Sequence, residues 1–228
     1  MSAEAIHNAK HLGWNQLAPL FSDERACCAA FMALETAEIL DGVKPANLIN
    51  VANRPQPCGR NLYQLWKKHG NDLLDGSGLT PRVMIDRGES LLLLVYRDEA
   101  FRALLSRPNV MAVLRRAGYR APFDTDNVLA ELGARLQTGN GFPHEIGVFL
   151  GYPLKDVAAF MGWISLPFSC QRLWKIYGDP RHSLQLAHRF SHCRNRMAHH
   201  LARQASAPHQ LANQPLGTGR HAFFSASN

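Results

Sequence analysis

The chain has 228 residues, 46% of them hydrophobic, which is enough for one domain with a substantial core. No apolar run approaches the ~20 residues of a transmembrane helix, and the start of the chain has Glu4 and no apolar signal core, so we expect neither a membrane partner nor secretion. The five cysteines form an odd set without a regular framework, which favours a reduced, cytoplasmic protein.

Charge is unevenly distributed along the chain. The net charge is +7, yet residues 1–170 contain 17 basic and 17 acidic residues. Residues 171–228 contain eight basic residues, one acid and seven of the eleven histidines. The sequence therefore predicts a neutral body with a basic C-terminal end, and residues 171–204 could contact the backbone of a nucleic acid.

The first half of the chain begins with a segment of mixed character, residues 1–23. Helical periodicity then predicts a helix over 24–40, begun by Asp23 as N-cap and stopped by Gly42. A strand at 44–51 and a short helix over 61–69, ended by Gly70, follow.

Two apolar runs in residues 82–96 flank a turn at 87–89 and predict a β-hairpin. After it, hydrophobic periodicity predicts several further elements. They are helices at 98–106, 109–117 and 125–136, a helical hairpin at 143–162, a strand at 173–177 and a long helix at 180–204.

These elements predict an α+β fold, with a small, mostly antiparallel sheet of about four strands wrapped by helices. Residues 24–204 form the single domain, with the helical hairpin at 143–162 and a long C-terminal helix. Residues 205–228 are rich in Ser, Pro, Asn, Gly and His without periodicity, so we expect a disordered tail.

Several segments resemble a known family, and the most specific is Phe142–Pro153, read as FPHEIGVFLGYP. Others are KPANL at 44–48, AGY at 117–119, and Cys170 followed by WKIYGD at 174–179. Together with Phe190 and Cys193 they are similar to domain-of-unknown-function family 3793, over roughly residues 24–196. The resemblance implies a cytoplasmic bacterial protein, found largely in anaerobes, without an assigned activity. Residues 171–173 depart from the pattern of the family.

The first functional hypothesis is a cytosolic binding or accessory protein. Its ligand is a small molecule or a protein partner, and a link to redox, metal or heme physiology is one form of this hypothesis. We expect its surface where the FPHEIG block, Cys170 and the WKIY strand meet, because uncommon residue types cluster there. The candidate residues are Phe142, His144, Glu145, Tyr152, Cys170, Trp174, Lys175 and Tyr177.

The alternative is a nucleic-acid-binding regulator that uses the hairpin at 146–157 and the basic C-terminal helix. Ile146–Val157 follows much of a helix–turn–helix pattern, with Gly151 at the turn. Its second helix, however, offers Lys155 as the only cation and no Arg, Asn or Gln for base edges. An ordinary helical hairpin packed on the sheet explains the same pattern.

A third hypothesis is an enzyme in which His144 and Glu145 act as an acid/base pair. No nucleophile or cofactor motif accompanies the pair, so the sequence leans against catalysis. The simpler interpretation is that Glu145 caps a helix and His144 bonds the preceding loop.

Metal ligation has four candidate residues: His188, His192, Cys170 and Cys193. The two histidines are spaced i,i+4 on one helix, which suits Zn, Ni or Cu. No CxxC spacing supports the cysteines, so buried free thiols and a solvated basic helix face are the simpler interpretation. The sequence identifies no cofactor.

Overall fold

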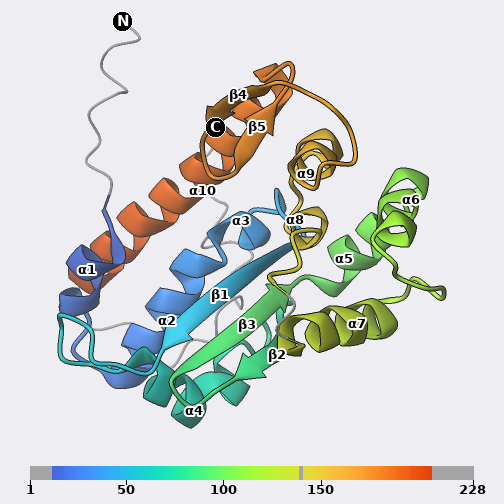
Figure 1. Cartoon of the computed structure of the whole chain (residues 1–228). Helices are drawn as coiled ribbons and strands as arrows, with labels where there is room; N and C mark the ends of the chain where they lie inside the picture. The colour runs from blue at the N-terminus through green and yellow to red at the C-terminus, as the bar shows by residue number, and fades with distance from the viewer. Residues whose placement is uncertain (1–11, 139–140, 207–228) are drawn as a thin grey trace, which may run out of the picture.

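A three-stranded antiparallel sheet lies at the centre of the structure (Figure 1). The computed structural model describes residues 12–138 and 141–206. The strand order is β1-β3-β2, so β3 pairs on both sides. The strands are β1 at Ala46–Ala52, β2 at Thr80–Asp86 and β3 at Ser90–Tyr96. The predicted strand and hairpin are therefore confirmed.

One face of this sheet is covered along β1 and β3. Side chains alternate between the two faces along a strand, so Ile49 and Val51 share a face with Leu91, Leu93 and Val95. This face packs against α2 (Glu24–Glu35) and α4 (Leu62–Leu73). It forms one hydrophobic core of the protein.

The opposite face is covered over only part of its area. Ala46, Leu94 and Tyr96, at one end of the strands, pack beneath the helices that follow β3. Leu48 and Leu92, farther along, are only partly buried. The covering helices are α5 (Asp98–Leu105), α6 (Pro108–Arg116), α7 (Thr125–Gln137) and α8 (Ile146–Phe149).

A second layer follows α8 in the chain and lies above the sheet in Figure 1. It consists of α9 (Leu154–Phe160), β4 (Phe168–Gln171), β5 (Lys175–Tyr177) and α10 (Arg181–Ser206). β4 and β5 form a separate two-stranded sheet. The α+β class, the small antiparallel sheets and the long C-terminal helix are confirmed, but the strands do not join one sheet, and β4 was not expected.

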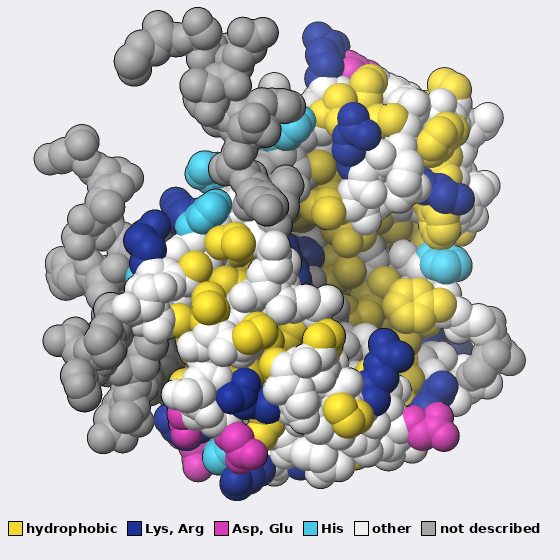
Figure 2. Space-filling model, turned by 90° about the vertical axis from the view of Figure 1, so that its left-hand side faces the viewer, with side chains coloured by type: hydrophobic (Ala, Val, Ile, Leu, Met, Phe, Trp, Pro, Cys, Tyr) yellow, Lys and Arg dark blue, Asp and Glu magenta, His cyan; other side chains and the backbone are white. Residues whose placement is uncertain are grey.

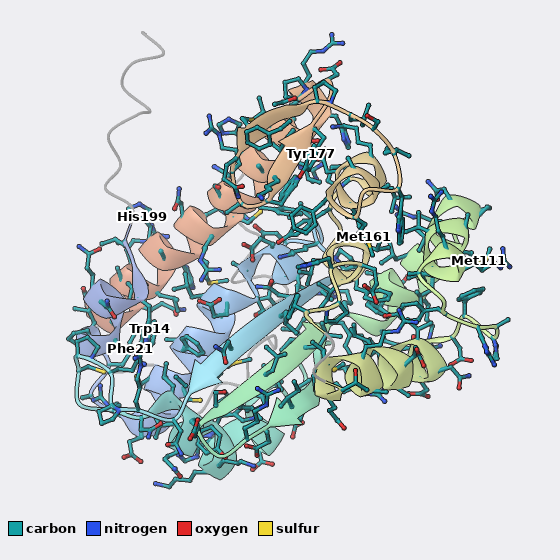
Figure 3. All side chains as sticks on the ribbon, viewed as in Figure 1. Trp14, Phe21, Met111, Met161, Tyr177 and His199 are labelled. Atoms are coloured by element: carbon teal, nitrogen blue, oxygen red, sulfur yellow. The ribbon has the colours of Figure 1, made fainter. Side chains whose placement is uncertain are left out.

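The end of the chain that precedes α2 also contributes to the core. Its elements are α1 (Trp14–Leu17) and η2 (Ala18–Leu20), and Leu17 is fully buried with Met197 and Leu201 of α10. Figure 3 shows Trp14 and Phe21 near the far end of α10. Trp14 also meets the ring of Phe31 edge-on, at 5.2 Å between centroids. The described part of the N-terminal segment is thus packed rather than peripheral.

Two predicted helix boundaries were wrong. The helix expected over 24–40 breaks at Thr36, whose hydroxyl donates to the Met32 carbonyl, and α3 (Ala37–Leu40) follows. The helix expected to end at Gly70 continues to Leu73. Gly70 is needed there because a Cβ would lie 2.7 Å from the Trp66 ring.

At the C-terminal end, α10 includes Ala205 and Ser206, and the rest of the predicted tail lies outside the described residues. None of the helices in the described part of the chain combines the length and apolarity that a membrane span requires.

Candidate functional site

The structure divides the predicted surface residues among three places. Tyr152 and Cys170 pack around Trp174 between α9, β4–β5 and α10. Tyr177 joins this group through its backbone amide, while its ring meets Phe168. Phe142, His144 and Lys175 form an outer group with Phe160. Glu145 lies elsewhere, beneath α7. Figure 3 shows Tyr177 on β5 close to α9, with Met161 at the end of α9.

Asp156 holds the inner group together. Its carboxylate is 1% exposed and accepts hydrogen bonds from Trp174 Nε1 at 2.9 Å and Ser183 Oγ at 2.6 Å. The Tyr177 amide at 3.0 Å and Lys155 Nζ at 2.7 Å complete the set. Burial alone would raise the pKa of Asp156, but these donors lower it below its ordinary value. Each oxygen of the Asp156 carboxylate accepts two of these hydrogen bonds. The carboxylate is therefore fully used in joining neighbouring elements, and we call this arrangement the Asp156 hub.

Above this hub, aromatic rings enclose a buried amine. The Tyr152 ring stacks on Trp174 at 4.5 Å between centroids. Lys44 Nζ lies 5.7 Å from the Tyr152 ring and 5.3 Å from the Phe190 ring, and donates to Asn47 Oδ1 at 2.8 Å. Burial lowers the pKa of Lys44 to about 8.

Glu38 lies beside this amine and is 5% exposed. Its Oε2 is buried and has no hydrogen-bond partner, while Oε1 lies 4.0 Å from Arg194 Nη1. Burial raises the pKa of Glu38, and the charge of Lys44 opposes that rise. The sequence pattern missed Lys44 and Glu38 because their partners on α10 are distant in the chain.

His144 and Glu145 point to different surroundings. Glu145 is 3% exposed and accepts from Arg135 Nη1 at 2.9 Å and Tyr119 OH at 3.3 Å. It makes no side-chain cap on α8, so the expected capping role was wrong. His144 is exposed and meets the Phe160 ring edge-on at 4.8 Å. Because Glu145 is committed to Arg135 and Tyr119, this geometry does not favour an acid/base pair.

The metal candidates do not converge in the described residues. No group of three or more His, Cys, Asp or Glu side chains is placed to hold an ion there. His188 and His192 are exposed on α10. Cys193 is buried, and burial raises the pKa of its thiol to about 12, which disfavours the thiolate that a metal binds. Cys170 is half-buried beside Trp174 and Ile176.

The predicted helical hairpin exists, with Gly151 at φ +75° between α8 and α9. Its second helix packs against β5 and α6. Lys155, the cation that this second helix would offer to DNA, binds Asp156 and the Tyr177 carbonyl instead. This packing does not favour insertion of α9 into a DNA groove.

Part of the basic charge of α10 is neutralised within the fold. Arg194 pairs with Glu35, and Arg196 pairs with Asp41. Both acids lie on or next to the helices α2 and α3, which α10 contacts. These arginines therefore fasten α10 to the domain, which reduces the charge left for a nucleic acid backbone.

The open half of the sheet forms a groove that sequence reasoning missed. Its cavity volume is about 530 Å³. Leu48, Ile85, Leu92 and Leu136 supply apolar lining and Phe142 an aromatic wall. The groove is completed by Gly141 and by three polar residues, Asn50, Arg87 and Ser90. Figure 2 shows a hollow with a hydrophobic floor on one side of the molecule, with Lys, Arg and His side chains around it.

Comparisons with known proteins give a family and no named relative. Neither the curated proteins nor the solved structures contain a significant match to this chain. A family model matches residues 32–211, which include the sheet, the groove, the Asp156 hub and α10. The chain therefore belongs to the family described as "Protein of unknown function (DUF3793)".

Proposed function

We propose that this protein binds a small amphiphilic anion, a molecule with an apolar body and an acidic end group. The observation that carries the proposal is the half-covered sheet face. Leu48 and Leu92 face a groove that no helix of the described chain fills, and apolar surface left open in this way marks a binding site.

The size of the groove suits a small molecule. Ligand cavities are typically about 300–1,000 Å³, and this one measures about 530 Å³. Most of its walls are aliphatic or aromatic, so an extended apolar chain or ring system would replace water there at a gain in free energy.

The polar residues of the groove favour an anion. Arg87 is exposed, and no described acidic side chain forms an ion pair with it. Ser90 and Asn50 also line the groove and add hydrogen-bonding groups. A guanidinium recognises carboxylates and phosphates through paired N–H donors. The ligand would therefore place its acid near Arg87 and its apolar body along Leu48 and Leu92.

Binding of dodecanoate and of dodecanol to the full chain tests this proposal. Both share one apolar chain, and only dodecanoate carries a charge. We expect saturable binding of dodecanoate, weakened about fivefold by Arg87→Gln, with little change for dodecanol. Phe142→Ala should weaken both, because it removes apolar wall without touching the charge.

Arg107→Gln is the matched control, since Arg107 is also exposed but lies outside the groove. Absence of saturable binding by either probe would overturn the proposal. An equal loss for both probes in Arg87→Gln would overturn the anion-recognition part.

A further inference from the structure

Exposed large hydrophobic side chains concentrate on one part of the molecule. Of the seven that the structure describes, five fall within residues 142–173. Four of these lie from the end of α9 through the β4–β5 hairpin, and we name them the apolar ridge. They are Phe160, Ile164, Phe168 and Leu173, with exposed fractions of 40%, 41%, 58% and 54%.

The charged side chains within the ridge segment are all basic. Residues 157–178 contain no Asp or Glu, and Arg172 and Lys175 are exposed among them. Lys175 Nζ lies 5.4 Å from the Phe160 ring. Arg116 of α6 lies 5.4 Å from the Trp163 ring and donates to the Trp163 carbonyl at 3.3 Å. Figure 2 shows hydrophobic and basic side chains side by side along the upper right of the molecule.

We propose that the apolar ridge docks the protein on the surface of an anionic lipid bilayer. Phe and Leu side chains that project beside Lys and Arg are the chemistry of an interfacial membrane site. The apolar groups enter the headgroup region while the cations meet lipid phosphates. The sequence alone did not predict a membrane partner, because it does not show that these four side chains are exposed in the folded chain.

The ridge is continuous with the groove. Phe142, in the groove wall, lies 6.0 Å from the His144 ring, and His144 lies 4.8 Å from the Phe160 ring. Docking through the ridge would therefore bring the groove near the lipid surface. The bilayer could then supply the amphiphilic anions that the groove binds. This connection between ridge and groove rests on the proposed function, whereas the docking itself does not.

Vesicle sedimentation with the full chain tests the docking. The vesicles are pure phosphatidylcholine, or phosphatidylcholine with about a third phosphatidylglycerol. We expect binding to the anionic vesicles alone, falling as salt is raised from about 0.1 M to about 0.5 M. The double variant Phe168→Ser/Leu173→Ser should lose at least about tenfold in partitioning.

Leu20→Ser/Val83→Ser is the matched control, because Leu20 and Val83 are also exposed but lie outside the ridge. This control should bind vesicles as the native chain does, and circular dichroism should show both double variants folded. Arg172→Gln/Lys175→Gln should weaken binding to anionic vesicles.

Three outcomes would overturn the docking. One is absence of vesicle binding, and another is full binding by the ridge variant. The third is a concentration-dependent dimer that the ridge variant abolishes without any vesicle binding, which would make the ridge an interface between copies. Arg87→Gln should still bind anionic vesicles, and the ridge variant should still bind dodecanoate. The first measurement tests docking without the groove, and the second tests the groove without docking, so failure of one proposal can be told from failure of the other.

Discussion

Trp174 and Asp156 are joined by a hydrogen bond of 2.9 Å between the indole Nε1 and a carboxylate that is 1% exposed. The same carboxylate accepts from Ser183 of α10, so a single side chain connects α9, the β4–β5 hairpin and the C-terminal helix. Trp174 was among the residues that the sequence singled out, but the aspartate that positions it was not.

Asp156→Asn should lower the free energy of unfolding by about 3 kcal/mol, because it leaves buried donors poorly paired and Lys155 without its partner charge. Urea unfolding measures this, with exposed Asp75→Asn as a control that should change the midpoint little. The folded pKa of Asp156 is lowered, so its contribution is present above the unfolded pKa of about 3.9 and is lost as pH falls. Equal midpoints for both variants would contradict the hub.

The Lys44 amine gives a prediction at alkaline pH. Its folded pKa is about 8 and its ordinary value is 10.5. Between these values the unfolded chain binds a proton that the folded chain has released, so this group makes stability rise with pH. Below pH 8 the amine is charged in both states, and the burial cost is fully present.

Lys44→Met removes this titration. We therefore expect the stability of Lys44→Met relative to the native chain to fall by about 2 kcal/mol between pH 7.5 and 9.5. Urea unfolding of both proteins across this pH range measures the difference between their stabilities. The other titrating groups are common to both proteins, so their contributions largely cancel in that difference. A difference that stays constant with pH would show that Lys44 is not buried as a charged amine.

The parts that sequence could predict are those set by local patterns. Two apolar runs on either side of 87–89 predicted the β2–β3 hairpin, and Asp23 correctly marked the start of α2. The half-open sheet face could not be predicted, because alternation shows which side chains share a face but not how far a later helix covers it. Glu145 shows the same limit, since its partners Arg135 and Tyr119 come from elsewhere in the chain.

Gly70 and Gly133 both lie inside helices, yet their substitution should have opposite effects. A Cβ at Gly70 would lie 2.7 Å from the Trp66 ring, whereas one at Gly133 would lie 3.7 Å from Met84 Cε in ordinary contact. Gly70→Ala should therefore destabilise by about 2 kcal/mol through overpacking. Gly133→Ala should stabilise by about 0.5–1 kcal/mol through helix propensity. Thermal unfolding of both variants checks the sign, and stabilisation by both would contradict the Trp66 packing.

The cysteines should differ in reactivity according to burial. Cys58 and Cys170 are partly exposed, while Cys27, Cys28 and Cys193 are buried. Burial raises the pKa of Cys28 and of Cys193 to about 12, so few of these thiols ionise near neutral pH. Alkylation by iodoacetamide at pH 7.5, followed by mass spectrometry, should modify Cys58 and Cys170 first. Modification of Cys193 at the same rate as Cys170 would contradict the packing of α10.

Gly151 tests how tightly the α8–α9 hairpin is seated on the start of β1. It has φ +75°, and a Cβ there would lie 2.8 Å from Pro45 Cδ. Gly162 has φ +70° with nothing within 4 Å of its Cβ position, so it shares the backbone strain without the clash. Gly162→Ala should cost about 1 kcal/mol of stability through the left-handed backbone, and Gly151→Ala about 3 kcal/mol through strain and overpacking together.

The difference between the two variants in urea unfolding isolates the contact with Pro45. Equal costs would mean that the hairpin can move away from β1 without loss, and that its position beside Lys44 is not fixed by this contact.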